Sequence, residues 1–374
     1  MNELSFSALG VSIGLVKSLS AMGLTQATPV QKRTIAPFLK GQDLIVQAPT
    51  GTGKTAAFGI PVCQMAEAEN RRIETLILCP TRELALQTAQ VIRQMQRGER
   101  KAQVVTIYGG ENIQKQFAAL RRNPQIVVAT PGRLVDHIKR RTIQLKNIQR
   151  VVLDEADRML DMGFRDDLDG ILEKIPQERQ TVLFSATLSR EILQIASLYL
   201  REDAMTIRVK QKALTVDTVK QYYTQVKEGK KGQALFSLLE EEAGLVLVFV
   251  NTKRMADRLS GQLQKRGYRA DALHGDMRQK QRDRVMQQYK KGGLDILVAT
   301  DVAARGIDVD NIRMVVNYDI PQDSDSYVHR IGRTGRAKKE GTAYTLILQK
   351  ELGKLKGMMR EIKVEIPARK AVMG

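Results

Sequence analysis

A short run of small side chains, ended by a lysine and a threonine, is the part of the sequence best suited to chemistry. It follows an aliphatic stretch and comprises Ala48, Pro49, Thr50, Gly51, Thr52, Gly53, Lys54 and Thr55. Small residues let backbone N–H groups approach phosphate oxygens closely, and a helix beginning here adds the positive charge of its N-terminus. Lys54 would place its charge at the β- and γ-phosphates, and the Thr55 hydroxyl could ligate Mg²⁺. The run predicts a phosphate-binding loop for a nucleoside triphosphate, with Ala48 where the common pattern has glycine.

An acidic pair follows another aliphatic stretch, at Asp154 and Glu155. Asp154 could hold the shell of a magnesium ion, and Glu155 could act as general base toward an attacking water. Taken alone, such a pair is often only a solvated strand end. Together with the phosphate loop, it indicates a nucleoside triphosphatase.

Recurring aliphatic runs predict the strands that would position these residues. They lie at 43–46, 75–79, 103–108, 125–130, 150–153, 181–186, 245–250, 268–274, 295–300, 313–318 and 341–348. Continuous β-branched runs are typical of strands covered on both faces, and the stretches between them, such as 83–96, have helical periodicity. The pattern predicts an α/β protein built from βαβ units with parallel sheets. Most runs end in small, polar or charged residues, so ligands should bind at the carboxyl edge of each sheet.

The alternation of predicted strands and helices is interrupted once, in the polar stretch 201–221, which has no sustained hydrophobic periodicity. We therefore expect two doubly wound lobes, residues 1–207 and 218–374, joined by a linker at 208–217. A net charge of +19 over 374 residues favours a polyanionic partner, although basic residues also keep a chain in solution. Residues 1–205 carry +6 and residues 206–374 carry +13, so the second lobe should attract a nucleic acid more strongly.

Other global features bear on location. No run of about 18 apolar residues is present, and the N-terminus lacks a basic segment followed by an apolar core. We expect neither a membrane span nor a signal peptide, and a cytoplasmic location. The two cysteines, Cys63 and Cys79, lack metal-site spacing and are expected to be buried thiols rather than a disulfide.

Further motifs occur in a fixed order: PTREL at 80–84, TPGR at 130–133, DEAD at 154–157, SAT at 185–187, FVNT at 249–252, HGDMRQKQR at 274–282, TDVAARGIDV at 300–309 and HRIGRTGR at 329–336. With these motifs, nearly the whole chain closely resembles the DEAD-box family of ATP-dependent RNA helicases. The resemblance implies two RecA-like lobes, ATP and Mg²⁺ as cofactors, and RNA as partner.

The resemblance also implies roles for single residues around the nucleotide. Gln31, in TPVQ at 28–31, would read the adenine, Phe6 would stack on it, and Asp308 would reach the ribose. The family usually has proline where this chain has Ala27, but the glutamine is intact. Phe6 could instead be a core anchor for the first helix.

The second lobe would contribute charge to the reaction, with Arg333 and Arg336 as arginine fingers at the γ-phosphate. Ser185 and Thr187 would belong to the catalytic machinery, and His329 would link DEAD and SAT to the second lobe. The simpler alternatives are a basic loop that favours solubility and a structural histidine.

The RNA contacts implied by the resemblance are shared between the lobes. They are Thr81, Arg82, Gly110, Thr130, Gly132 and Arg133 in the first lobe, and Thr252, Gln279, Arg282 and Thr300 in the second. Hydroxyls, backbone amides and arginines suit phosphates and 2′-hydroxyls rather than base edges. Aromatic residues make up 5% of the chain and tryptophan is absent, so base-stacking platforms are not expected.

Because neither lobe holds a complete site, hydrolysis should require closure of the lobes around ATP and RNA. The expected outcome is local strand separation by a monomer that binds RNA and not DNA. The short end of the chain after 348 suggests a minimal bacterial member without an appended domain, acting on ribosomal precursors, other ribonucleoproteins (RNPs) or messages trapped at low temperature. An ATP-gated RNA clamp that hardly unwinds is the main alternative. A translocating helicase is disfavoured by DEAD and Gln31, and a small-molecule kinase leaves the second lobe unexplained.

Overall fold

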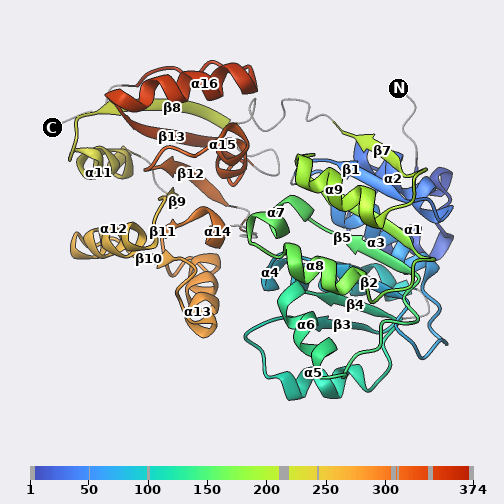
Figure 1. Cartoon of the computed structure of the whole chain (residues 1–374). Coiled ribbons are helices and arrows are strands. Elements are labelled where there is room, and N and C mark those ends of the chain that lie inside the picture. The colour runs from blue at the N-terminus through green and yellow to red at the C-terminus, as the bar shows by residue number, and fades with distance from the viewer. Residues whose placement is uncertain are drawn as a thin grey trace. The chain divides into compact units, whose positions relative to one another are not determined.

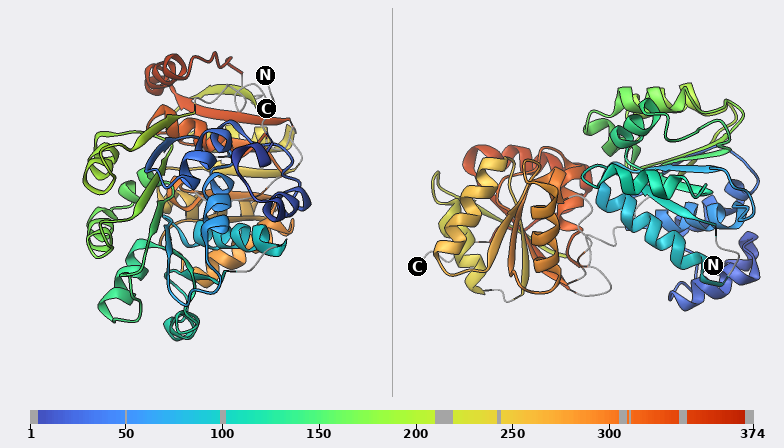
Figure 2. Two further views of the ribbon diagram at one scale, coloured as in Figure 1. Left: turned by 90° about the vertical axis from the view of Figure 1, so that its right-hand side faces the viewer. Right: turned by 90° about the horizontal axis from the view of Figure 1, so that it is seen from below.

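A computed structural model of the chain describes residues 5–49, 51–98, 102–209, 219–241, 244–304, 309, 311–335 and 340–369. The chain divides into two compact units, Met1–Gln211 and Lys212–Gly374. Each unit is a parallel sheet with helices on both faces (Figures 1 and 2). The expected α/β fold class, with two parallel-sheet lobes, is confirmed.

The first unit is built on a seven-stranded sheet in the order β3-β4-β2-β5-β6-β1-β7. Every pairing in it is parallel. Its strands are β1 (Leu44–Gln47), β2 (Thr75–Leu78), β3 (Val104–Ile107), β4 (Ile126–Ala129), β5 (Arg150–Leu153), β6 (Gln180–Ser185) and β7 (Met205–Arg208). The strand order differs from the chain order, so carboxyl ends that are distant in sequence become neighbours.

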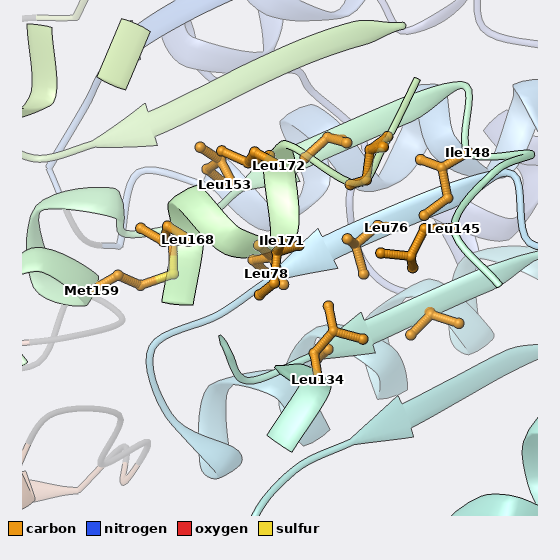
Figure 3. Close-up of a cluster of buried hydrophobic side chains, with 14 of the residues drawn as sticks. Leu76, Leu78, Leu134, Leu145, Ile148, Leu153, Met159, Leu168, Ile171 and Leu172 are labelled. Carbon is orange, nitrogen blue, oxygen red and sulfur yellow. The ribbon is translucent and has the colours of Figure 1, made fainter. Parts of the chain in front are cut away.

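Helices cover the two faces of this sheet in separate groups. They are η1 (Ser7–Leu9), α1 (Ile13–Ala21), α2 (Pro29–Leu39), α3 (Lys54–Met65), α4 (Arg82–Met95), η2 (Gln96–Gly98), α5 (Ile113–Leu120), α6 (Pro131–Lys139), α7 (Ala156–Asp161), α8 (Arg165–Leu172) and α9 (Arg190–Tyr199). α2, α3 and α4 bury Phe38, Phe58 and Ile92 against one face. α6, α7 and α8 bury Leu134 and other side chains against Leu76 and Leu78 on the opposite face (Figure 3).

The second unit has a six-stranded parallel sheet in the order β10-β11-β9-β12-β13-β8. Its strands are β8 (Val219–Val226), β9 (Leu245–Phe249), β10 (Ala270–Leu273), β11 (Ile296–Ala299), β12 (Ile312–Asn317) and β13 (Gly341–Leu348). α11 and α12 pack on one face, and α13 to α16 on the other. The helices are α11 (Lys231–Glu241), α12 (Lys253–Lys265), α13 (Gln279–Lys290), α14 (Asp301–Ala304), α15 (Ser324–Ile331), η3 (Gln349–Glu351) and α16 (Leu352–Ile362).

All eleven aliphatic runs form strands within a residue or two of their expected bounds. Two strands, β7 and β8, were not expected. β7 exposes three of its four residues, and β8 alternates between buried and exposed positions, because both lie at sheet edges. Edge strands lack the continuous apolar runs of central ones. Arg208, the first residue of the expected linker, is the last residue of β7, and residues 210–217 of that linker lie outside the described part.

Candidate nucleotide and nucleic-acid sites

The phosphate loop, the acidic pair and the SAT motif meet at one edge of the first sheet. Strands β5, β6 and β1 are neighbours, and their carboxyl ends carry Asp154, Ser185 and Ala48 respectively. The Ala48 N–H donates to the Ser185 carbonyl at 2.9 Å, and the Asp154 N–H donates to the Leu78 carbonyl at the same distance. Beyond the carboxyl ends of a parallel sheet is where ligands of such folds bind.

The loop between β1 and α3 has the backbone shape that its glycines allow. Gly51 and Gly53 have φ angles of 83° and 91°, in the left-handed region that favours glycine. α3 begins at Lys54, so its first N–H groups point into the loop. Thr52 closes the turn by donating its hydroxyl to the Pro49 carbonyl at 2.8 Å. Thr50 lies outside the described residues.

Gln31 lies directly against this loop. Its Oε1 accepts from the Thr28 N–H at 2.9 Å, and its Nε2 donates to the Gly53 carbonyl at 3.2 Å. A Cβ at position 53 would come within 2.5 Å of that Nε2, which is a second reason for glycine there. The side chain predicted to read adenine is therefore coupled to the phosphate loop. The amide retains one donor and one acceptor position for a base.

Phe6 is 2% exposed and packs in a cluster with Leu9, Leu15 and Ile60. This packing matches the alternative in which Phe6 anchors the first helix. Its stacking on adenine stays a prediction.

Three buried polar atoms at this edge have no hydrogen-bond partner among the described residues: Lys54 Nζ, Asp154 Oδ1 and Ser185 Oγ. Burial raises the pKa of Asp154 to about 7, while nearby Lys54 opposes the shift. Leaving buried polar groups unsatisfied is costly, so such atoms are typical of a ligand-binding site. An ammonium, a carboxylate oxygen and a helix N-terminus fit a triphosphate with its magnesium ion, and Thr55 is the next residue of α3.

No group of three or more His, Cys, Asp or Glu side chains in the described ranges is placed to hold a metal ion by itself. Mg²⁺ commonly takes one or two carboxylates and completes its shell with water and substrate phosphates. The small donor set at Asp154 and Thr55 is compatible with that mode of binding.

Glu155 stands at the N-terminal boundary of α7 with φ 52° and ψ 52°, a left-handed conformation that is uncommon for a residue with a side chain. The turn directs the chain from β5 into α7. The Glu155 carboxylate is 5% exposed and pairs with the Arg158 guanidinium. A backbone held in an uncommon conformation at a sheet edge is typical of functional sites.

Asp157 also lies at this edge, although the sequence alone assigned it no role. Its Oδ2 accepts from the Ala186 N–H at 3.1 Å, the Thr187 N–H at 3.0 Å and the Thr187 hydroxyl at 3.3 Å. One carboxylate thus joins the DEAD motif to the SAT motif within the first unit and orients Thr187. Its place as the last letter of DEAD was the available signal.

The residues assigned to RNA contact in the first unit follow β2, β3 and β4, which are also neighbours. Thr81 caps α4 by accepting the Leu84 N–H at 3.3 Å. The Arg82 guanidinium lies 4.8 Å from the centre of the Tyr108 ring. Gly110 has φ 81°, while Thr130 and Gly132 open α6. Arg133 donates to the Glu111 carbonyl at 3.2 Å. Because the three strands are neighbours, all six residues predicted to contact RNA in this unit lie at one edge of the sheet.

In the second unit, Thr252 and Thr300 follow β9 and β11, which are adjacent strands. Thr252 caps α12 by accepting the Met255 N–H at 3.2 Å, and Arg282 lies on α13. His329 is half-buried in α15, and Arg333 follows it with 7% exposure. The side chain of Gln279 and the whole of Asp308 and Arg336 lie outside the described residues.

Arg330 is a second residue to which the sequence alone assigned no role. It is 1% exposed, and its guanidinium donates to both Asp301 carboxylate oxygens at 2.6 Å, to the Asp319 carbonyl at 2.7 Å and to Asn251 Oδ1 at 3.0 Å. It thereby ties α15, which leads into Arg333, to the carboxyl ends of three strands. Arg330 is therefore placed to position Arg333, which is predicted to be an arginine finger.

Arg330→Ala should weaken this part of the second unit by about 3 kcal/mol, because removing one partner of a buried ion pair leaves the other charge unpaired. Hydrogen exchange measured by mass spectrometry should accelerate in peptides covering α14 and α15. Arg284→Ala, at an exposed position of α13, is the matched control and should leave exchange unchanged. Equal exchange in the two variants would contradict the positioning role.

Comparisons with known proteins cover both units. The model of the DEAD/DEAH box helicase family matches residues 28–195, and that of the helicase conserved C-terminal domain matches residues 230–338. The ATP-dependent RNA helicase CshA of Listeria monocytogenes is 47% identical over 352 residues, which cover 94% of this chain and 67% of that protein. The chain belongs to the DEAD-box family of ATP-dependent RNA helicases.

Other relatives agree with this family. DEAD-box CshA of Geobacillus kaustophilus is 46% identical over 96% of this chain and 77% of its own length. A DEAD box protein from Methanococcus jannaschii has a TM-score of 0.57 at 41% identity, covering 98% of this chain and 99% of that one. S. cerevisiae Dbp5 bound to RNA and ADP BeF3 has a TM-score of 0.86 at 32% identity, covering 98% and 96%.

As a DEAD-box helicase, the chain is an ATP hydrolase, which agrees with the predicted phosphate loop. In the part of the chain that the structure describes, every helix is too short or too polar to cross a membrane. Cys79 is buried and Cys63 half-buried, and neither forms a disulfide bond.

Proposed function

We propose that this helicase couples RNA-stimulated ATP hydrolysis to closure of its two units around ATP and RNA. The observation that carries the proposal is the set of unpartnered buried atoms of Lys54, Asp154 and Ser185 in the first unit. The arginines assigned to the γ-phosphate, Arg333 and Arg336, belong to the second unit. If both ligands favour the closed form, each tightens the binding of the other.

In the proposed reaction, the backbone N–H groups of the loop and the N-terminus of α3 bind the phosphates, and Lys54 offsets their charge. Thr55 and Asp154 would hold Mg²⁺, which would neutralise charge on the phosphate oxygens. Glu155 orients the attacking water and takes its proton. Arg333 and Arg336 place positive charge where negative charge develops at the γ-phosphate.

RNA binds along the sheet edges through its backbone, with Thr81, Arg82 and Arg133 in the first unit and Thr252 and Thr300 in the second. The available donors are hydroxyls, guanidinium groups and backbone amides, which recognise phosphates and 2′-hydroxyls. In support, Dbp5 was solved with RNA and ADP BeF3, and Mss116p with ssRNA and AMP-PNP. A clamp on one bent strand opens a short duplex locally.

We place the enzyme in the cytoplasm as a monomer, acting on ribosomal RNA precursors or other RNPs, or on messages at low temperature. The second candidate is an ATP-gated RNA clamp, which would use the same residues and bind without separating strands.

Duplex substrates separate these mechanisms. Short RNA duplexes with a 3′ tail, a 5′ tail or a separately tethered single strand should all be unwound at similar rates under multiple turnover. Strict dependence on one tail polarity would contradict local opening in favour of translocation. ATP-dependent binding without any strand separation would establish the clamp instead.

A further inference from the structure

A solvent-open cavity of about 670 Å³ lies at the outer edge of the first sheet, away from the nucleotide residues. Its lining includes β3, the terminal strand of the sheet, which pairs with β4. α4 and η2 contribute Arg93 and Arg97, while α5 and the turn after it contribute Lys115 and Arg122. We call this cavity the basic groove. Figure 1 shows β3 and α5 at the end of the sheet opposite β7.

Positive charge dominates the basic groove. Among the described residues, its lining has four cationic side chains and one carboxylate, Glu111. Lys115 lies 3.7 Å from that carboxylate. Arg97 and Arg122 are exposed, and within the described ranges neither forms an ion pair. Excess positive charge around a concavity concentrates polyanions, which release their counterions on binding.

The edge of β3 within the groove is partly closed to another strand. Arg93 Nη2 donates to the Val104 carbonyl at 2.7 Å, so this outward carbonyl already has a partner. A peptide that adds to a sheet edge needs free main-chain groups along the strand. The capped carbonyl and the exposed arginines favour a phosphate backbone over an added peptide strand.

The basic groove is continuous with the residues assigned to RNA contact. Gln116 lines the groove at 3% exposure, and its Nε2 donates to the Tyr108 carbonyl at 2.9 Å. Its Oε1 lies 3.5 Å from Nη1 of Arg133 and 2.9 Å from the buried His137 ring. Tyr108 also lines the groove and carries the Arg82 guanidinium on its ring. One network of contacts therefore joins the groove to the edge of the sheet that carries Arg82 and Arg133.

From this geometry we propose that the basic groove is a second RNA-binding surface. It binds the phosphates of single-stranded RNA that extends past the sheet edge carrying Arg82 and Arg133. The inference rests on the proposed function, because that edge must bind RNA first. The helicase would then hold a longer strand than its motifs alone can cover, without reading its sequence.

The test compares a single strand of about 8 nucleotides with one of about 25, both bound in the presence of a non-hydrolysable ATP analogue. In Arg97→Glu/Arg122→Glu, affinity for the long strand should fall roughly tenfold at 0.1 M salt. The slope of log affinity against log salt should fall by about 1.4, since each single-strand phosphate contact contributes about 0.7. Affinity for the short strand should stay within a factor of about two. RNA-stimulated ATP turnover with the short strand should persist.

Arg71→Glu/Lys146→Glu makes the same change in charge at exposed positions in the loops before β2 and β5, outside the lining of the groove. This control should bind both strands as the unchanged chain does. In the unchanged chain, 4-thiouridine near one end of the long strand should crosslink to peptides from residues 93–122.

An unchanged affinity of Arg97→Glu/Arg122→Glu for the long strand would overturn the proposal that the groove binds RNA, and would favour an acidic peptide as its ligand. An equal loss of affinity for both strands, or a loss of affinity in the control Arg71→Glu/Lys146→Glu, would also overturn the proposal. Failure of the unchanged chain to bind the short strand with the ATP analogue would instead defeat the proposed function.

Discussion

Lys54→Ala should lower ATP turnover by about 100- to 1,000-fold, the range found when a single charge-stabilising group is lost from an active site. Lys54 is 7% exposed, and its ammonium has no hydrogen-bond partner among the described residues. A buried ammonium in that state is positioned for an anion. The test is ATP turnover measured at saturating RNA, with ATP binding followed separately by a fluorescent analogue.

Lys174→Ala, at an exposed position after α8, is the matched control and should retain full turnover. Thermal unfolding of the two variants separates loss of chemistry from loss of fold. Near-normal turnover in a folded Lys54→Ala would mean that the phosphates bind elsewhere.

Glu155→Gln should reduce hydrolysis by about 1,000-fold while ATP and RNA still bind. The amide keeps the size of the carboxylate and can still accept a hydrogen bond from Arg158, but it cannot take a proton from water. The variant should accumulate complexes with both ligands that persist in a gel-shift assay. Long-lived complexes follow because release waits on hydrolysis.

Glu173→Gln, on the exposed end of α8, provides the control for loss of one negative charge. Rapid hydrolysis by Glu155→Gln would remove Glu155 as the base. Loss of ATP binding in that variant would show that the carboxylate supports the site instead of the reaction.

The sequence predicted the central strands well, because a strand buried on both faces must be apolar along its length. β2, β4 and β6 are buried at every position, and each was an aliphatic run. β7 and β8 lie at sheet edges and face water at several positions, so their composition did not distinguish them from a linker. Their pairing with β1 and β13 depends on the fold as a whole.

The candidate site, too, could be predicted only in part from the sequence. Short motifs predicted roles for Lys54, Asp154 and Glu155, since phosphate and water chemistry require those residue types next to strand ends. Which strand ends are neighbours follows from the order β5-β6-β1, which no local pattern encodes. For that reason, the contacts of Asp157 with Thr187 and of Arg330 with Asp301 could be found only in the structure.

The central claim is that the two units must act together on ATP and RNA. Steady-state ATP turnover by the purified chain, measured with and without saturating single-stranded RNA, tests that claim most directly. RNA should raise turnover at least about tenfold, because it favours the closed form that completes the catalytic site. Equal turnover in the two conditions would contradict the claim.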